Sequence, residues 1–156
     1  MKNYSEFKIA KYRKILSTRK AYILDGDFAR TKPLAYTLLN YVDYGIKHWK
    51  YLYLSLLDYL WNRDSTRFEM LVDNEDHLTE RGNYLFSRNK KKINTTPKEI
   101  CDGIYVETCL STFQICNIIK KVLGFYYINY KDMKIYLTPL HEIVKEMGPL
   151  DLSDLY

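Results

Sequence analysis

The sequence predicts a mainly α-helical protein with one small β-hairpin, and three observations support this fold class. Apolar residues recur at helical intervals in two segments, 46–63 and 111–123. Between 125 and 138 the chain is instead rich in aromatic and β-branched residues around a short polar turn, as in a hairpin. With 156 residues, of which 47% are hydrophobic, the chain can bury a core. We expect a basic N-terminal arm at 1–32, one domain at 33–147 and a C-terminal tail at 148–156.

Helices are expected in the N-terminal part of the chain. Tyr4 to Lys20 is predicted to form either a basic helix or an arm that orders on a partner. A helix is predicted from Pro33 to Tyr44, because its apolar residues share one side and Gly45 can end it. From Ile46 to Arg63 a longer helix carries apolar residues around more than half of its circumference, which predicts that it is buried.

The weakest pattern lies between residues 64 and 94. A helical turn is expected at Phe68 to Val72, an acidic loop at Asp73 to Asp76, and a short strand or helix at Tyr84 to Phe86. The segment ends in a basic run that either contacts phosphates or is a solvated linker. We favour contact, because the run lies immediately before the first helix of the predicted DNA-binding unit described next. Its residues are Arg88, Lys90, Lys91 and Lys92.

Two helices are predicted next, and the second has a distinctive polar face. Thr96-Pro97-Lys98-Glu99 has the pattern of a capped helix start, and this helix is expected to end near Tyr105. Ser111 is a candidate cap for a helix that runs to Leu123, where Gly124 ends it. The core-facing stripe of the second helix is Ile115, Ile118, Ile119 and Val122. Its opposite face carries Ser111, Thr112, Gln114, Asn117, Lys120 and Lys121. Asn and Gln can pair with adenine and Lys can neutralise phosphate, so this face is a candidate DNA-binding surface, although every surface helix has a polar face.

A β-hairpin and a final helix are predicted near the C-terminus. The strands are expected at Phe125 to Tyr130 and at Lys134 to Thr138. Lys131 and Lys134 flank the turn, where they can follow a sugar-phosphate backbone, and the alternative is an ordinary hairpin with solvated lysines. A helix from Leu140 to Met147 follows. Helix, turn, helix and hairpin in this order describe a winged helix-turn-helix with an N-terminal helical extension.

The segment 95–147 resembles the MarR-like group of winged-helix regulators. Thr96 to Ile100 corresponds to the "TPKEIA"-like helix of that family, and Ser111 to Leu123 corresponds to its recognition helix. Asp132-Met133-Lys134 corresponds to the Asp-x-Arg element of the wing, and Leu137-Thr138 to the "LT" that starts the next helix. The resemblance implies a DNA-binding regulator.

The distribution of charge agrees with this expectation. The formal net charge is +5, and residues 1–35 hold nine Lys or Arg against three Asp or Glu. Arg88 to Lys98 adds five basic residues and no acidic one. Basic segments of this kind are expected of a nucleic-acid binder, although many basic proteins bind nothing in particular.

The remaining features limit the class of protein. Three cysteines, Cys101, Cys109 and Cys116, lack Cys-x-x-Cys spacing and are expected to be reduced, with Cys109 as a candidate redox-sensing thiol. No phosphate-binding loop, nucleophile elbow or pair of catalytic carboxylates is evident, so we expect neither an enzyme nor a cofactor or metal site. Without a signal peptide or a long apolar run, the expected location is the cytoplasm, with no membrane partner.

These observations predict sequence-specific binding of double-stranded DNA by a transcriptional regulator. The regulator is expected to act as a homodimer that pairs through its N-terminal helices. A replication or plasmid-maintenance initiator is an alternative within DNA binding. A protein-interaction module is the alternative from a different class, since such domains also serve as partner-binding units.

Overall fold

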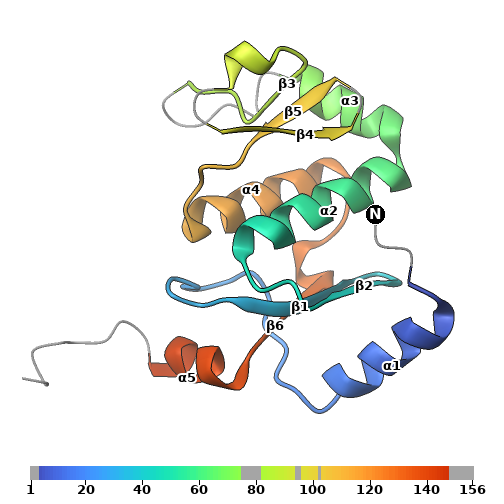
Figure 1. Ribbon diagram of the computed structural model, residues 1–156, viewed down its shortest axis with the longest axis vertical. Helices are drawn as coiled ribbons and strands as arrows, with labels where there is room; N and C mark the ends of the chain where they lie inside the picture. The colour runs from blue at the N-terminus through green and yellow to red at the C-terminus, as the bar shows by residue number, and fades with distance from the viewer. Residues whose placement is uncertain (1–3, 75–81, 94–95, 102, 148–156) are drawn as a thin grey trace, which may run out of the picture. The chain divides into compact units, whose positions relative to one another are not determined.

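The computed structural model describes residues 4–74, 82–93, 96–101 and 103–147. Within them lie five α-helices and two three-stranded antiparallel sheets (Figure 1). The chain divides into two compact units: a middle unit, Lys50–Ile128, and a terminal unit made of the described residues of Lys2–Trp49 and Asn129–Tyr156. Each unit contains one of the sheets, so the expectation of a mainly α-helical fold with a single hairpin wing is wrong. The fold is α/β.

The terminal unit is built on the sheet β2–β1–β6. β1 (Pro33–Leu38) and β2 (Tyr41–Tyr44) form an antiparallel hairpin. β6 (Met133–Leu137) lies on the other side of β1, with Lys134 opposite Thr37, and follows the short 3₁₀ helix η3 (Tyr130–Asp132). Burial alternates along β6, as expected for a strand with one face against a core.

Two helices complete the terminal unit. α1 (Glu6–Leu16) packs on the sheet through Leu16, which shares a buried cluster with Ala35 and Val42. The segment Tyr4 to Lys20 therefore contains a helix, which was one of its two expected forms. α5 (Pro139–Met147) agrees with the predicted final helix. Arg19 connects α5 to the rest of the unit through an ion pair of 3.0 Å with Glu142.

The helix predicted at Pro33 to Tyr44 is wrong, because this segment forms β1 and β2. Its apolar residues happen to recur at helical intervals, but the chain reverses at Leu39, whose φ is 53°. Both strands then hydrogen-bond to neighbours, Leu38 opposite Tyr41 and Tyr36 opposite Ile135. Gly45, expected to end a helix, instead follows β2 with φ of 77°.

The middle unit combines three α-helices with the sheet β3–β5–β4. Its helices are α2 (Trp49–Arg63), α3 (Ser65–Asp73) and α4 (Thr112–Phe125). Its strands are β3 (Phe86–Ser87), β4 (Pro97–Cys101) and β5 (Ile104–Glu107), with the 3₁₀ helix η2 (Lys90–Lys92) between β3 and β4. Phe68 of α3 meets Phe86 of β3 edge to face, with ring centroids 6.0 Å apart. An aromatic contact therefore joins helix and sheet.

The helix predicted to start at Thr96 is also wrong, because Pro97 and its successors form the hairpin β4–β5. β4 is an edge strand, where a proline without an N–H is tolerated. The turn contains Gly103 at φ of 74°, a left-handed conformation that glycine enters freely. Thr96 does not cap a helix, since its carbonyl accepts the N–H and the hydroxyl of Thr108.

The strand predicted at Phe125 to Tyr130 does not form. α4 continues through Gly124 to Phe125, and the following residues make its C-terminal cap and η3. The second predicted strand does exist as β6, but it pairs with the distant β1 rather than with a strand that directly precedes it in the sequence. No wing follows α4 among the described residues, so the winged helix-turn-helix assignment is wrong.

The long amphipathic helices were predicted correctly. α2 begins at Trp49, three residues after the expected start, and ends at Arg63 as expected. The predicted stripe of α4 is buried, with Ile119 fully covered.

No helix within the described ranges is long and apolar enough to cross a bilayer. Of the cysteines, Cys116 is buried, Cys101 is half-buried and Cys109 is exposed.

Two buried tyrosines of the middle unit differ in how their hydroxyls are satisfied. The Tyr53 hydroxyl has no hydrogen-bond partner among the described residues. Burial raises the pKa of Tyr53 well above its usual value, so the group stays neutral. The Tyr126 hydroxyl, in contrast, lies 3.2 Å from the Leu60 carbonyl oxygen and 3.0 Å from that of Asp64. One tyrosine therefore retains an unsatisfied polar group and the other closes the α2–α3 corner.

Tyr53→Phe is expected to raise the free energy of unfolding by about 1 kcal/mol, because it removes a buried hydroxyl without a partner. Tyr126→Phe, the matched control, is expected to lower it by about 1 kcal/mol, since two carbonyls lose a donor. Urea denaturation of the two variants measures both values. Destabilisation by Tyr53→Phe would show that its hydroxyl does have a partner in solution.

Candidate nucleic-acid interface

The start of α4 uses two of the predicted site residues as a capping box. Ser111 Oγ accepts the backbone N–H of Gln114 at 3.2 Å, and Gln114 Oε1 accepts the N–H of Ser111 at 2.8 Å. A glutamine that pairs with adenine needs both its oxygen and its amide nitrogen. Base contact by Gln114 would therefore break the capping box.

The solvent side of α4 holds the other predicted residues of this helix. Lys121 is exposed, while Thr112, Asn117 and Lys120 are half-buried. Phe113, which was not predicted as a site residue, is 75% exposed in the first turn. α4 contains no aspartate or glutamate, so the only charges on the helix are the two lysines.

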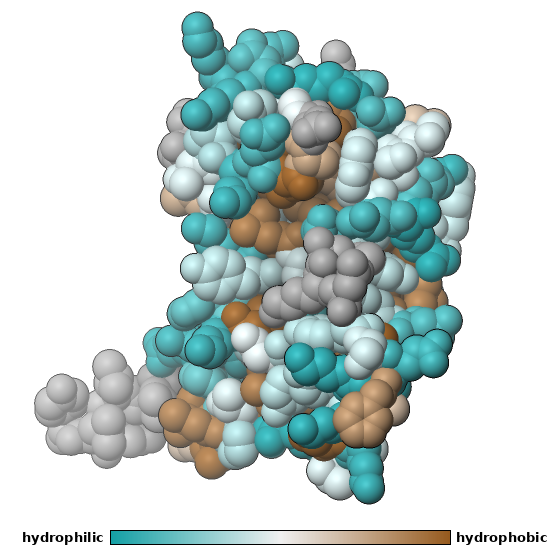
Figure 2. Space-filling model, turned by 45° about the vertical axis from the view of Figure 1, so that its right-hand side comes forward, coloured by the Kyte–Doolittle hydropathy of each residue, from teal (hydrophilic) through white to brown (hydrophobic). Residues whose placement is uncertain are grey.

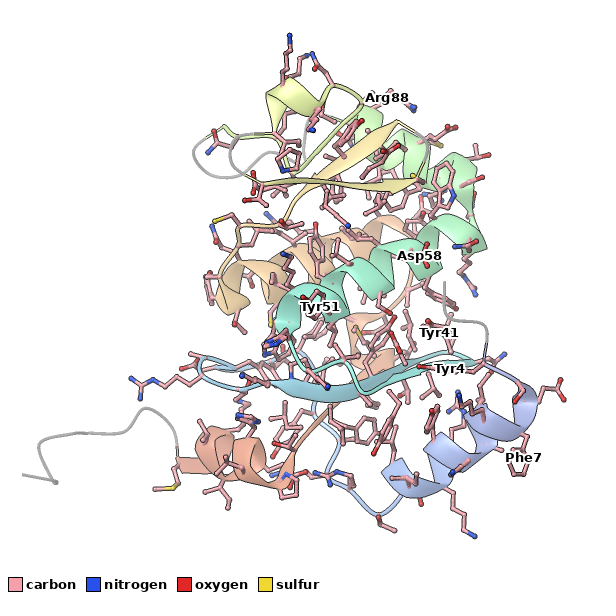
Figure 3. The ribbon with its side chains drawn as sticks, in the orientation of Figure 1. Tyr4, Phe7, Tyr41, Tyr51, Asp58 and Arg88 are labelled. Carbon is pink, nitrogen blue, oxygen red and sulfur yellow. The ribbon has the colours of Figure 1, made fainter. Side chains whose placement is uncertain are left out.

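The residues of the basic run before β4 differ in their contacts. Arg88, beside α3 (Figure 3), forms an ion pair with Asp73 at 3.2 Å and lies 3.9 Å from a Glu69 oxygen. The hydrogen bond that Arg88 donates to the Asp73 carboxylate raises the pKa of Arg88 above its usual value. In η2, Lys90, Lys91 and Lys92 are exposed. The lysines therefore present positive charge, whereas Arg88 is neutralised by α3.

The two lysines expected on the wing lie in the terminal unit. Lys131 is exposed in η3, whose first turn is capped by the Asn129 side chain. Lys134 lies on β6, and its Nζ donates to the Lys131 carbonyl at 2.9 Å. The two lysines lie close together, but Lys131 is in η3 and Lys134 is on β6, so they do not flank the tip of a hairpin as expected.

The C-terminal end of α4 carries a cluster that sequence reasoning missed. Arg67 of α3 places its guanidinium carbon 4.8 Å from the ring centroid of Tyr127 and 5.4 Å from that of Phe125. Its Nη1 donates to the Phe125 carbonyl at 2.8 Å, which satisfies one of the unpaired carbonyls at the helix end. Tyr127 is 85% exposed. The cluster therefore presents an aromatic ring to solvent beside a fixed positive charge.

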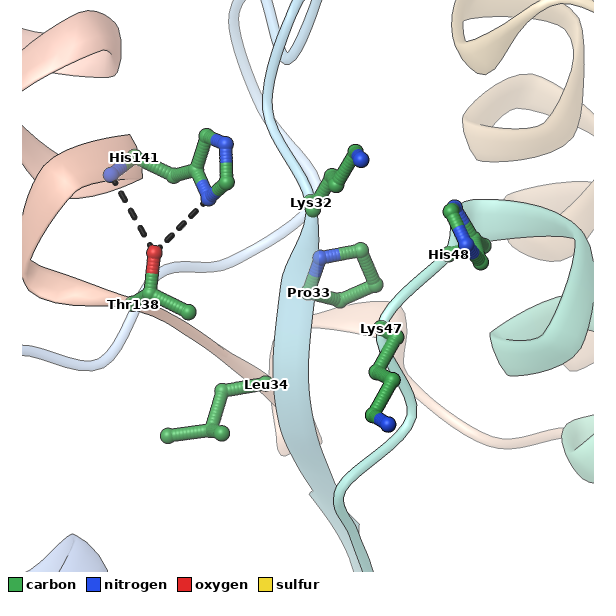
Figure 4. Close-up of a pocket in the computed structure, with 7 residues that line it drawn as sticks. All are labelled: Lys32, Pro33, Leu34, Lys47, His48, Thr138 and His141. Carbon is green, nitrogen blue, oxygen red and sulfur yellow. Dashed lines mark hydrogen bonds between the residues drawn. The ribbon is translucent and has the colours of Figure 1, made fainter.

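The terminal unit contains a cavity of about 260 Å³ near the start of α5 (Figure 4). Its lining includes basic and neutral side chains: Lys32, Pro33, Leu34, Lys47, His48, Thr138 and His141. The Thr138 hydroxyl accepts the His141 N–H at 3.3 Å and lies 2.7 Å from its Nδ1. Lys32 and Lys47 point in opposite directions (Figure 4), so their charges do not converge on one ligand position.

The terminal unit also exposes apolar side chains. Leu140, Ile143 and Met147 share one face of α5 and are each more than half exposed, and Figure 2 shows brown side chains over this helix. On α1, Phe7 is 81% exposed and points away from the sheet (Figure 3). The face of α5 that carries Leu140 is apolar, whereas the solvent side of α4 is polar apart from Phe113.

Within the described ranges, no three His, Cys, Asp or Glu side chains come together as a metal site would need. Comparisons of the chain with protein-family models, curated proteins and solved structures gave no match.

Ser111→Ala is expected to lower the free energy of unfolding by about 1 kcal/mol, because the first turn of α4 loses its cap. Gln114→Ala is also expected to lower the free energy of unfolding, because it removes the other half of the capping box. Lys121→Ala, on the same helix but outside the capping box, serves as control and is expected to stay within about 0.5 kcal/mol of the wild-type value. Unchanged stability of Ser111→Ala would mean that the box does not form in solution.

Proposed function

We propose that this chain binds double-stranded DNA through the solvent side of α4. The observation that supports the proposal is the charge of this helix. Each of the other four described α-helices contains at least one carboxylate, whereas α4 contains none and carries Lys120 and Lys121. A helix without acidic residues does not repel the phosphates that line a groove.

The dimensions of α4 suit a major groove. With 14 residues the helix is about 21 Å long, and the major groove of B-DNA, about 12 Å wide, admits a helix. Asn117 is the residue best suited to pair with a base edge, since Gln114 serves the cap. Lys120 and Lys121 would hold phosphates, and the exposed lysines of η2 in the same unit would add further phosphate contacts.

In its finer form, the proposal is a transcriptional regulator in the cytoplasm that acts as a homodimer. The dimer surface expected from two N-terminal helices needs revision, because one of those segments is the hairpin β1–β2. Lys131 and Lys134 stay predicted phosphate contacts of the terminal unit.

A protein-interaction module is the competing function, and the apolar face of α5 favours it. Salt distinguishes the two functions. DNA binding weakens steeply as salt rises because counterions are released, whereas an interface with an apolar core is far less sensitive.

The double variant Lys120→Ala/Lys121→Ala is expected to bind every duplex more weakly and to reduce the slope of log K against log salt by about 1.8, the value for two phosphate contacts. Fluorescence anisotropy over a salt series measures the slope. The control variant Lys50→Ala/Lys98→Ala removes the same charge from exposed positions on α2 and β4. It should change the slope of log K against log salt less. Equal effects of the two double variants, or no duplex binding by the wild type at low salt, would contradict the proposal.

A further inference from the structure

The end of α4 places a tyrosine where the backbone favours glycine. The N–H of Ile128 donates to the Leu123 carbonyl at 2.9 Å, and the N–H of Tyr127 donates to the Gly124 carbonyl at 3.0 Å. These two bonds define a Schellman motif, in which the residue after the cap adopts a left-handed conformation. Tyr127 accordingly has a φ of 56°, a region that glycine enters freely and that disfavours residues with a Cβ. Its backbone position therefore gives no reason for a tyrosine.

Burial does not explain the tyrosine either. Its neighbour Tyr126 is buried and packs at the α2–α3 corner, whereas the Tyr127 side chain is 85% exposed. What the ring does contact is the guanidinium of Arg67, which is fixed in place by its bond to the Phe125 carbonyl. The ring is thus positioned by a cation and remains accessible to a ligand.

An accessible ring beside a guanidinium has the chemistry of a surface on which a nucleobase stacks. Lys121, which is exposed, precedes Phe125 by one helical turn, about 6 Å along the axis. Lys121 therefore lies on the turn of α4 that precedes the cluster, where it is available to hold a phosphate of the strand whose base stacks on Tyr127. A base inside a paired stack has no free face, so the ligand must contain an unpaired base.

Building on the proposed DNA binding, we infer that Tyr127 and Arg67 form a stacking surface for an unpaired base. The chain then binds DNA that carries an unpaired base more tightly than a fully paired duplex. The substrate class is a single strand, or a duplex interrupted by an unpaired nucleotide.

Three labelled DNAs test the inference with the full chain: a duplex, the same duplex with one unpaired nucleotide, and one of its strands alone. The wild type is expected to bind the interrupted duplex and the single strand about tenfold more tightly than the duplex, within the range for stacking of one base. Tyr127→Gly and Tyr127→Asn accept the left-handed backbone and should lose the preference. Tyr127→Phe keeps the ring and should keep it.

Stability measurements separate a structural role from a binding role. Tyr127→Gly is expected to melt at or above the temperature of the wild type, because glycine suits the conformation. Equal affinity of the wild type for all three DNAs, or a preference that survives in both Tyr127→Gly and Tyr127→Asn, overturns the inference. If the duplex still binds and depends on Lys120 and Lys121, the proposed function stands without the inference. If none of the three DNAs binds, both are overturned.

Discussion

The antiparallel pairing of β1 with β6 is the constraint on which the terminal unit depends. It joins two segments separated in sequence by the entire middle unit, and it places Leu38 opposite Met133, both fully buried. Without this pairing β1 and β2 would form an isolated hairpin, which is marginally stable in water. The free energy of closing a loop grows only slowly with its length, so a folded unit can be inserted between two strands at little additional cost. The pairing also determines the structure of the C-terminal segment, because β6 hydrogen-bonds to β1 and therefore does not form a hairpin with the residues that follow α4.

Sequence patterns predicted the long helices and missed the hairpins β1–β2 and β4–β5, whose strands are short. α2 and α4 are long amphipathic helices, and their apolar periodicity is a strong signal over 15 and 14 residues. The strands contain two to six residues, too few for alternation to outweigh a chance helical spacing. In β1–β2 the turn at Leu39 brings together apolar residues that also fit a helix face. In β4 the sequence Thr-Pro-Lys-Glu matched a helix start, although the same proline suits an edge strand.

The candidate site likewise has features that could be predicted from the sequence and features that could not. The polar face of α4 could be predicted from sequence because it follows from helical periodicity alone, and Lys121 is indeed exposed. The second use of Gln114 was also present in the sequence, since Ser-x-x-Gln is a capping-box pattern. The Arg67 cluster could not be predicted, because it joins two helices whose packing no local pattern specifies. Arg88 shows the converse, since its basic character is evident in sequence while its neutralisation by Asp73 is not.

The two ends of α4 follow opposite rules, and the contrast argues that its C-terminal end is not optimised for stability. The N-terminal end satisfies its backbone donors with a complete capping box. At the other end Gly124 lies within the helix, where nothing within 4 Å would meet an added Cβ, although alanine there would be more favourable by about 1 kcal/mol. Tyr127 occupies the left-handed position that glycine favours, at a cost that is likewise on the order of 1 kcal/mol. Exchanging the two residue types would suit the backbone at both positions, so the conformational preference of the backbone does not account for the residues at this end of α4.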